Sequence, residues 1–139
     1  MAKHTAYILS DDARAQAEFY TRALGGEIVS VMTHGVMPEA TEEWRDKVIH
    51  LHMIGAGVNF YLSDSVFGPV HYGSSLLQNL EFATDAEARD AFTKLAEGGT
   101  VQFPLEPAFW GALHGQVQDK FGVLWMITTE AQSAASSME

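Results

Sequence analysis

The sequence predicts an α+β fold built from two tandem βαβββ units, and three observations support this. First, residues 9–28 and 82–101 match at seven of twenty positions when they are set 73 residues apart. Second, each copy places a short β-prone stretch before a helical pattern. Third, three strand-like stretches follow each helix. The matched pairs are Asp12/Asp85, Ala13/Ala86, Ala15/Ala88, Phe19/Phe92, Ala23/Ala96, Gly25/Gly98 and Gly26/Gly99.

The first unit spans about residues 5–64 and begins with a strand at 5–9. Asp12 is a good N-cap, because a short carboxylate accepts hydrogen bonds from the free N–H groups of the first helical turn. Apolar residues then recur at helical spacing for about 12 residues, and Gly25 provides a left-handed end to the helix. Three further strands are expected, at 26–33, 47–54 and 57–63.

The second unit, about 74–129, repeats this order with a strand at 76–83, an N-cap at Asp85 and a helix stop at Gly98. Its last three strands are expected at 99–104, 113–119 and 122–129. The small and polar tail, 130–139, is expected to be frayed.

Composition excludes several classes of function. A chain of 139 residues is expected to form a single domain, 1–139. The absence of cysteine excludes disulfides, thiolate nucleophiles and Cys-based metal sites. A net charge of −10 opposes binding to nucleic acid. No apolar run approaches the roughly 18 residues that a membrane span needs, so no membrane partner is expected and we predict a cytoplasmic protein.

The doubled unit resembles the vicinal oxygen chelate (glyoxalase/bleomycin resistance/dioxygenase) superfamily, and within it the PhnB-like branch. The segments that resemble it are EFYTRALGGE at 18–27, GVMPEA at 35–40, VIHLHMIGAGVNFYLSDS at 48–65 and FWGALHGQVQDKFGVLWMIT at 109–128. The resemblance implies a curved mixed sheet around a half-open cavity, with the helices on the outer face. It also implies a homodimer, because many members assemble the cavity from two chains.

The resemblance implies that metal-dependent relatives carry His or Glu ligands on the first and last strand of each unit. The last-strand positions hold Tyr61 and Met126 here, and neither side chain suits a hard divalent metal. The first-strand positions give His4 and Gln78, although counting from the helix gives Thr5 instead of His4. A shift of one residue reverses which face a side chain occupies, so His4 stays unassigned. We therefore predict no cofactor, with a divalent metal as the alternative.

His50 and His52 lie two residues apart in a strand and so share one face of it. We expect that face to line the cavity, together with Asn59 and Tyr61 of the next strand. One interpretation is a shifted metal site completed by His114 or a carboxylate. The other is a polar wall that binds a ligand, and it is favoured because neither predicted strand carries Asp or Glu.

The second unit offers two further candidate ligand contacts, Trp110 and His114. The Trp110 indole suits a wall for a flat ligand, although a core position is an open alternative. His114 belongs to a polar row that could line the cavity or face solvent. Trp125 is expected in the core, and Asp119 is expected to form the turn before the last strand. His34 and His71 are expected to be solvated.

Our first functional hypothesis is a small-molecule-binding protein of this superfamily without the usual metal, similar to its antibiotic-sequestering members. The alternative is a divalent-metal-dependent lyase, isomerase, transferase or dioxygenase acting on a vicinal-oxygen substrate. Its candidate ligands are His4, His50, His52 and Gln78. A third hypothesis is a dimeric scaffold whose cavity has lost its function.

Overall fold

The structure is a computed structural model that describes residues 1–130 of the chain. The chain forms two compact units, Met1–Val70 and His71–Glu139. The predicted tail lies outside the described residues except for Glu130, whose N–H donates a hydrogen bond of 3.0 Å to the Phe82 carbonyl. Within the described part, no helix is both long and apolar enough to cross a membrane.

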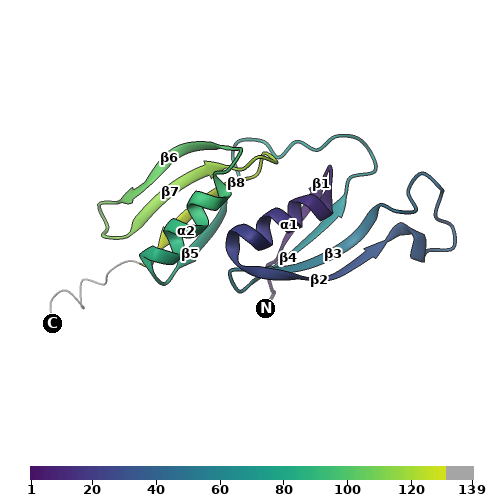
Figure 1. The fold of residues 1–139 in the computed structure, drawn as a ribbon, viewed down its shortest axis with the longest axis horizontal. Helices are drawn as coiled ribbons and strands as arrows, with labels where there is room; N and C mark the ends of the chain where they lie inside the picture. The colour runs from purple at the N-terminus through teal and green to yellow at the C-terminus, as the bar shows by residue number, and fades with distance from the viewer. Residues whose placement is uncertain (131–139) are drawn as a thin grey trace. The chain divides into compact units, whose positions relative to one another are not determined.

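The first unit is a four-stranded mixed sheet with one helix across one face (Figure 1). The strand order is β1-β4-β3-β2, in which β1 runs parallel to β4 and the other pairs are antiparallel. Its elements are β1 (Ala6–Ser10), α1 (Ala13–Leu24), β2 (Gly26–Thr33), the 3-10 helix η1 (His34–Val36), β3 (Val48–Gly55) and β4 (Val58–Asp64).

The second unit has the same topology, with strand order β5-β8-β7-β6 and β5 parallel to β8. Its elements are β5 (Gln78–Phe82), α2 (Asp85–Leu95), β6 (Thr100–Pro107), β7 (Leu113–Gln118) and β8 (Leu124–Thr129). The predicted order βαβββ therefore occurs twice, and the α+β class is confirmed. The described strands form two separate sheets, each open rather than closed into a barrel.

Each unit buries the face of the sheet that its helix covers. In the first unit, Leu51, Met53 and Leu62 are fully buried there. In the second, Val117, Trp125 and Ile127 are fully buried in the same way, which confirms the core position of Trp125. Burial of large apolar side chains is the main stabilising contribution of each unit.

Asp119 forms the turn between β7 and β8, as predicted. Its Oδ1 accepts hydrogen bonds from the N–H groups of Phe121 (2.8 Å) and Val123 (3.1 Å). Its Oδ2 accepts one from the Trp125 indole (2.8 Å). The carboxylate is 3% exposed, so these donors replace the water that it loses on burial.

The predicted spacing of the repeat is wrong by one residue over the first strand and helix. Gly57 and Gly122 precede the last strand of each unit, so Phe60 corresponds to Trp125. The Cα partners of these two residues are Ala6 and Gln78, which are 72 residues apart rather than 73.

The helices follow the same spacing of 72. The N-cap of α1 is Asp12, as predicted, and its side chain accepts a hydrogen bond from the Ala15 N–H. The N-cap of α2 is Thr84, so the prediction of Asp85 is wrong, and Asp85 is the first helical residue. The Gly-Gly pairs do lie 73 apart, at the start of β2 and just before β6, where a Cβ on Gly26 or Gly99 would meet backbone of the neighbouring strand. One extra residue after α2 absorbs the difference.

Candidate functional site

We call the face of each sheet opposite its helix the open face of that unit. In β3, Leu51 and Met53 point to the helix and are fully buried, while His50 and His52 lie on the open face and are half-buried. In β4, Asn59 and Tyr61 lie on the open face by the same alternation. The predicted face pattern of these two strands is thus confirmed.

Tyr61 is the centre of a cluster of rings on the open face of the first unit. Its ring centroid lies 4.9 Å from that of His50 and 5.1 Å from that of His52. Tyr7 of β1 completes the cluster, with its centroid 5.9 Å from His50 and 6.3 Å from Tyr61. The rings are tilted rather than stacked on one another, so parts of their faces and edges are available to a ligand.

The sequence prediction missed Tyr7. The predicted first-strand positions were His4 or Thr5 and Gln78, whereas strand pairing makes Tyr7 the Cα partner of Tyr61 and Asn79 that of Met126. Tyr7 is 51% exposed on the open face. A spacing of 72 alone gives Ala6 as the counterpart of Gln78, so both first-strand positions also needed a shift of one residue toward the C-terminus.

One hydrogen bond orders the polar atoms of this cluster. The His52 Nε2 lies 2.7 Å from the Asn59 Oδ1. The His50 nitrogens, the His52 Nδ1, the Tyr61 hydroxyl and the Asn59 amide nitrogen make no hydrogen bond with residues 1–130. In that part of the chain no buried side-chain nitrogen or oxygen lacks a partner, so these atoms are open to solvent or ligand.

Asp64 positions the start of the strand that carries both histidines. Its Oδ1 accepts a hydrogen bond of 2.8 Å from the N–H of Ala13, and its Oδ2 accepts one of 2.7 Å from the N–H of Val48. Thr129 plays a similar part in the second unit, where its hydroxyl accepts a hydrogen bond of 2.9 Å from the Leu113 N–H. The sequence analysis did not identify either role.

The donor set does not fit the metal that the superfamily implies. Within residues 1–130, no group of three or more His, Asp or Glu side chains could hold a metal ion. His4 is exposed and precedes β1, and Gln78 lies on the helix-facing side of β5 with Leu80 and Phe82. The ring cluster contains two imidazoles but no carboxylate, and hard divalent cations prefer oxygen-rich shells.

The open face of the second unit carries different side chains at the equivalent positions. His114 corresponds to His50 and Gln116 to His52, as strand pairing shows. Trp110 is 45% exposed, and its centroid lies 5.8 Å from that of His114 in an edge-on arrangement. Both predicted contacts of this unit therefore lie together.

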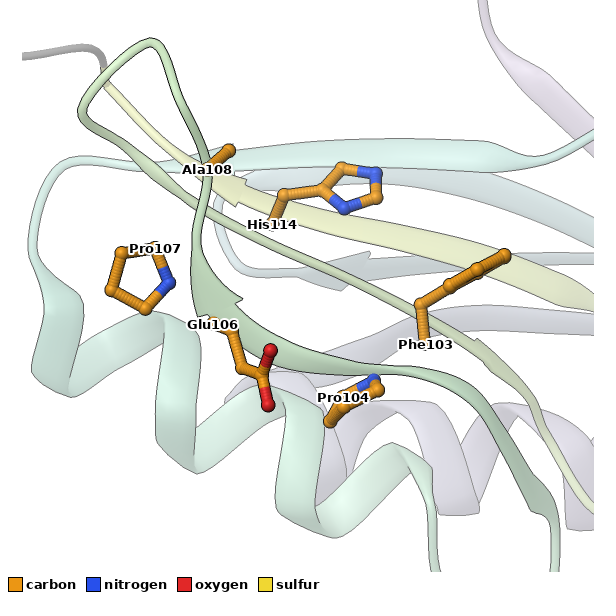
Figure 2. Close-up of a pocket in the computed structure, with 6 residues that line it drawn as sticks. All are labelled: Phe103, Pro104, Glu106, Pro107, Ala108 and His114. Atoms are coloured by element: carbon orange, nitrogen blue, oxygen red, sulfur yellow. The ribbon is translucent and has the colours of Figure 1, made fainter.

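A small open pocket of about 170 Å³ lies between β6 and β7. Figure 2 shows the rings of Phe103 and His114 projecting from these neighbouring strands, with the other lining residues along β6 and just after it. This volume suits a small ring at most. The lining residues are Phe103, Pro104, Glu106, Pro107, Ala108 and His114.

The two loop histidines differ from each other. His71 is exposed, as predicted. His34 is half-buried in η1, with its ring centroid 5.6 Å from that of Trp44. Trp44 also contacts Phe67 edge-on at 5.7 Å.

Comparison with known proteins agrees with this architecture. The profile of the Glyoxalase/Bleomycin resistance protein/Dioxygenase superfamily matches residues 2–127. Protein YjdN of Escherichia coli is 28% identical over 126 residues, which cover 82% of this chain and 85% of that protein.

Two solved structures are also similar. Protein PA1353 from Pseudomonas aeruginosa is 32% identical, with a TM-score of 0.80, over 94% of this chain and 98% of that one. A PhnB protein from Bacillus cereus is 26% identical, with a TM-score of 0.75, over 93% of this chain and 100% of that one. This chain thus belongs to the glyoxalase/bleomycin resistance protein/dioxygenase superfamily.

Proposed function

We propose that this PhnB-like member of the superfamily binds a small organic molecule and does so without the usual metal. The observation that carries the proposal is the ring cluster on the open face of the first unit. Tyr7 and Tyr61 lie on its first and last strands, where the resemblance implies metal ligands in other members. Their aromatic rings favour an organic ligand over a metal ion.

The polar atoms of the cluster support ligand binding rather than a purely structural role. Tyr61, His50 and His52 make ring contacts, but several of their nitrogen and oxygen atoms have no hydrogen-bond partner in the described chain. Binding sites commonly combine such a ring surface with a few unpaired polar groups that orient the ligand.

The proposed assembly is a homodimer, as the resemblance implies, and analytical ultracentrifugation tests it.

The test combines metal analysis with thermal unfolding. Protein purified without chelator should contain no stoichiometric metal, and Zn²⁺, Mn²⁺, Ni²⁺ or Fe²⁺ should not raise the unfolding temperature. A ligand from a library of small aromatic compounds, at 100 times its dissociation constant, should stabilise the protein by about 2.7 kcal/mol, a shift of several degrees. Tyr61→Ala should reduce the shift to about half, because binding about tenfold weaker leaves the ligand at about 10 times its dissociation constant. His71→Ala, at an exposed loop position, should preserve the shift.

The opposite result would support the metal-dependent enzyme. Stoichiometric metal, together with a large metal-induced shift that both His50→Ala and His52→Ala abolish, would overturn metal-free binding. A library that produces no shift in the wild-type protein would contradict small-molecule binding itself.

A further inference from the structure

We infer that Asn59 holds the ring of His52 in one tautomer, so that its Nδ1 is a fixed hydrogen-bond acceptor for a hydroxyl or N–H group of the ligand. The inference rests on the proposed function, because it concerns the same open face. It adds the role of one residue and the chemical class of the ligand.

The tautomer follows from the chemistry of the contact. The Oδ1 of an asparagine can only accept a hydrogen bond, and it lies 2.7 Å from the His52 Nε2. The proton must therefore be on Nε2. A neutral imidazole carries a single N–H, so Nδ1 is left with a lone pair.

The lone pair on Nδ1 is accessible. His52 is half-buried, and its Nδ1 has no partner in residues 1–130. Since that part of the chain holds no buried side-chain nitrogen or oxygen without a partner, Nδ1 is not enclosed. The Asn59 Oδ1 therefore accepts the hydrogen bond from His52, and the His52 Nδ1 remains available to accept one from the ligand.

The surroundings define the ligand class. The rings of Tyr61, His50 and Tyr7 form a surface suited to a flat ligand. The ring cluster and Asn59 include no Lys, Arg, Asp or Glu, so nothing in them pairs with a fully charged group of either sign. The ligand we expect is flat, uncharged and equipped with a hydroxyl or N–H donor.

The tautomer can be tested without any ligand. In ¹⁵N-labelled protein, two-bond correlations between ring nitrogens and ring C–H protons identify the protonated nitrogen, and the spectrum of His52→Gln assigns the His52 signals. A pH series selects the neutral form of the ring. We expect the Nε2–H form in the wild-type protein, its retention in Asn59→Asp, and a mixture of both forms in Asn59→Leu. Asn79→Ala, an exposed amide of β5, is the matched control and should change nothing. The Nδ1–H form in the wild type would overturn the inference.

The ligand class can be tested with a matched pair of probes, 2-naphthol and 2-methoxynaphthalene, in which a methyl group replaces the hydroxyl proton. The bound ether would shield the His52 Nδ1 from water without donating a hydrogen bond to it, which is energetically unfavourable. The ether should therefore bind the wild-type protein about 5- to 150-fold more weakly than the naphthol. In Asn59→Leu the difference should shrink to about twofold.

These outcomes separate the inference from the proposed function. Equal binding of the two probes would overturn the recognition of a donor, while binding by the open face would stand. No binding of either probe, together with library ligands that still produce shifts reduced by Tyr61→Ala, would overturn the ligand class alone. A wild-type protein that responds to no library ligand would contradict both.

Discussion

The two units share a backbone plan but differ sharply in what their open faces carry. Where the first unit has His52, Asn59 and Tyr61, the second has Gln116, Leu124 and Met126. The backbone plan is maintained by side chains that differ in kind but act alike, as Asp64 and Thr129 do at the start of β3 and β7. The comparison shows that the positions that hold the sheet together retain their roles, while the open face changes its chemistry.

The interiors under the helices differ as well. In the first unit, the buried hydroxyl of Ser10 donates to the side-chain Oε1 of Gln16, and the side-chain Nε2 of Gln16 donates to the Tyr20 hydroxyl. At the spacing of 72, the corresponding residues of the second unit are Phe82, Ala88 and Phe92, all apolar and buried. These three positions are thus polar and hydrogen-bonded in one core and apolar in the other.

The largest expected effect concerns the turn between β7 and β8, which is held by a buried aspartate that the turn between β3 and β4 lacks. Asp119→Ala removes the acceptor of three hydrogen bonds and should lower the free energy of unfolding by about 3–5 kcal/mol. Urea unfolding followed by tryptophan fluorescence measures it. Asp119→Asn, which retains one acceptor oxygen, should cost less, and equal losses for the two variants would contradict this account.

The buried polar chain of the first unit gives the next largest effect. Gln16→Ala removes one hydrogen-bond partner from each of two buried hydroxyls, those of Ser10 and Tyr20, and creates a cavity, so we expect a loss of about 2–4 kcal/mol in urea unfolding. Gln102→Ala, at an exposed position of β6, should cost less than about 0.5 kcal/mol. A Gln16→Ala protein as stable as the wild type would show that the chain contributes nothing.

Gly115 sharpens the comparison, because the first unit has Leu51 at the same position. A Cβ on Gly115 would lie 2.8 Å from the ring of Phe92 and 2.9 Å from the Cα of Leu105. Gly115→Ala should therefore destabilise the protein by about 1–3 kcal/mol in thermal or urea unfolding. An unchanged stability would mean that β6 can move away freely.

The open faces can be compared through ligand binding. Tyr61→Ala should weaken the binding of a flat aromatic ligand about tenfold, which corresponds to about 1.4 kcal/mol of lost ring contact. Met126→Ala changes the equivalent position of the second unit and should weaken it no more than about twofold. Fluorescence titration measures both, and a reversed order would place the ligand on the second unit.

The smallest effect concerns the tight turn between β3 and β4. Ala56 has a φ of 52° and is the one described residue other than glycine with a positive φ. This conformation costs an alanine roughly 1–2 kcal/mol, part of which the flexibility of glycine offsets. Ala56→Gly should thus raise stability by about 0.5–1 kcal/mol in thermal unfolding. A lower melting temperature would contradict it.

The elements of this fold could be predicted from the sequence, but the spacing between the copies could not. The Gly25 helix end, the Asp12 cap and the alternation around His50 and His52 are local signals, and each is confirmed. The stop predicted at Gly98 is not, because α2 ends at Leu95 with Ala96 as its C-cap. The spacing failed because both helices are rich in alanine, so that identities accumulate at 73 although the buried positions align at 72. The pairing of β1 with β4 and of β5 with β8 reveals the difference, and it joins residues that are far apart in the chain.

The spacing error is only part of the reason why Tyr7 was missed, because at a spacing of 72 Gln78 corresponds to Ala6 rather than to Tyr7. His50, His52, Asn59 and Tyr61 lie on strands adjacent in both sequence and sheet, so alternation alone brings them together. Tyr7 joins them through a parallel pairing that crosses the whole unit. The contact of Asn59 with His52 depends on side-chain conformations that no periodic pattern encodes.

Asp64 ties together three stretches of chain that are distant in sequence. The Asp64 carboxylate accepts hydrogen bonds from the N–H groups of both Ala13, in the first turn of α1, and Val48, at the start of β3. A local opening that displaces Asp64 therefore breaks both hydrogen bonds at once. The protection of these two amides from deuterium exchange should therefore change together. A ligand that immobilises β3 on the open face should also slow exchange at the start of α1, on the opposite face of the sheet.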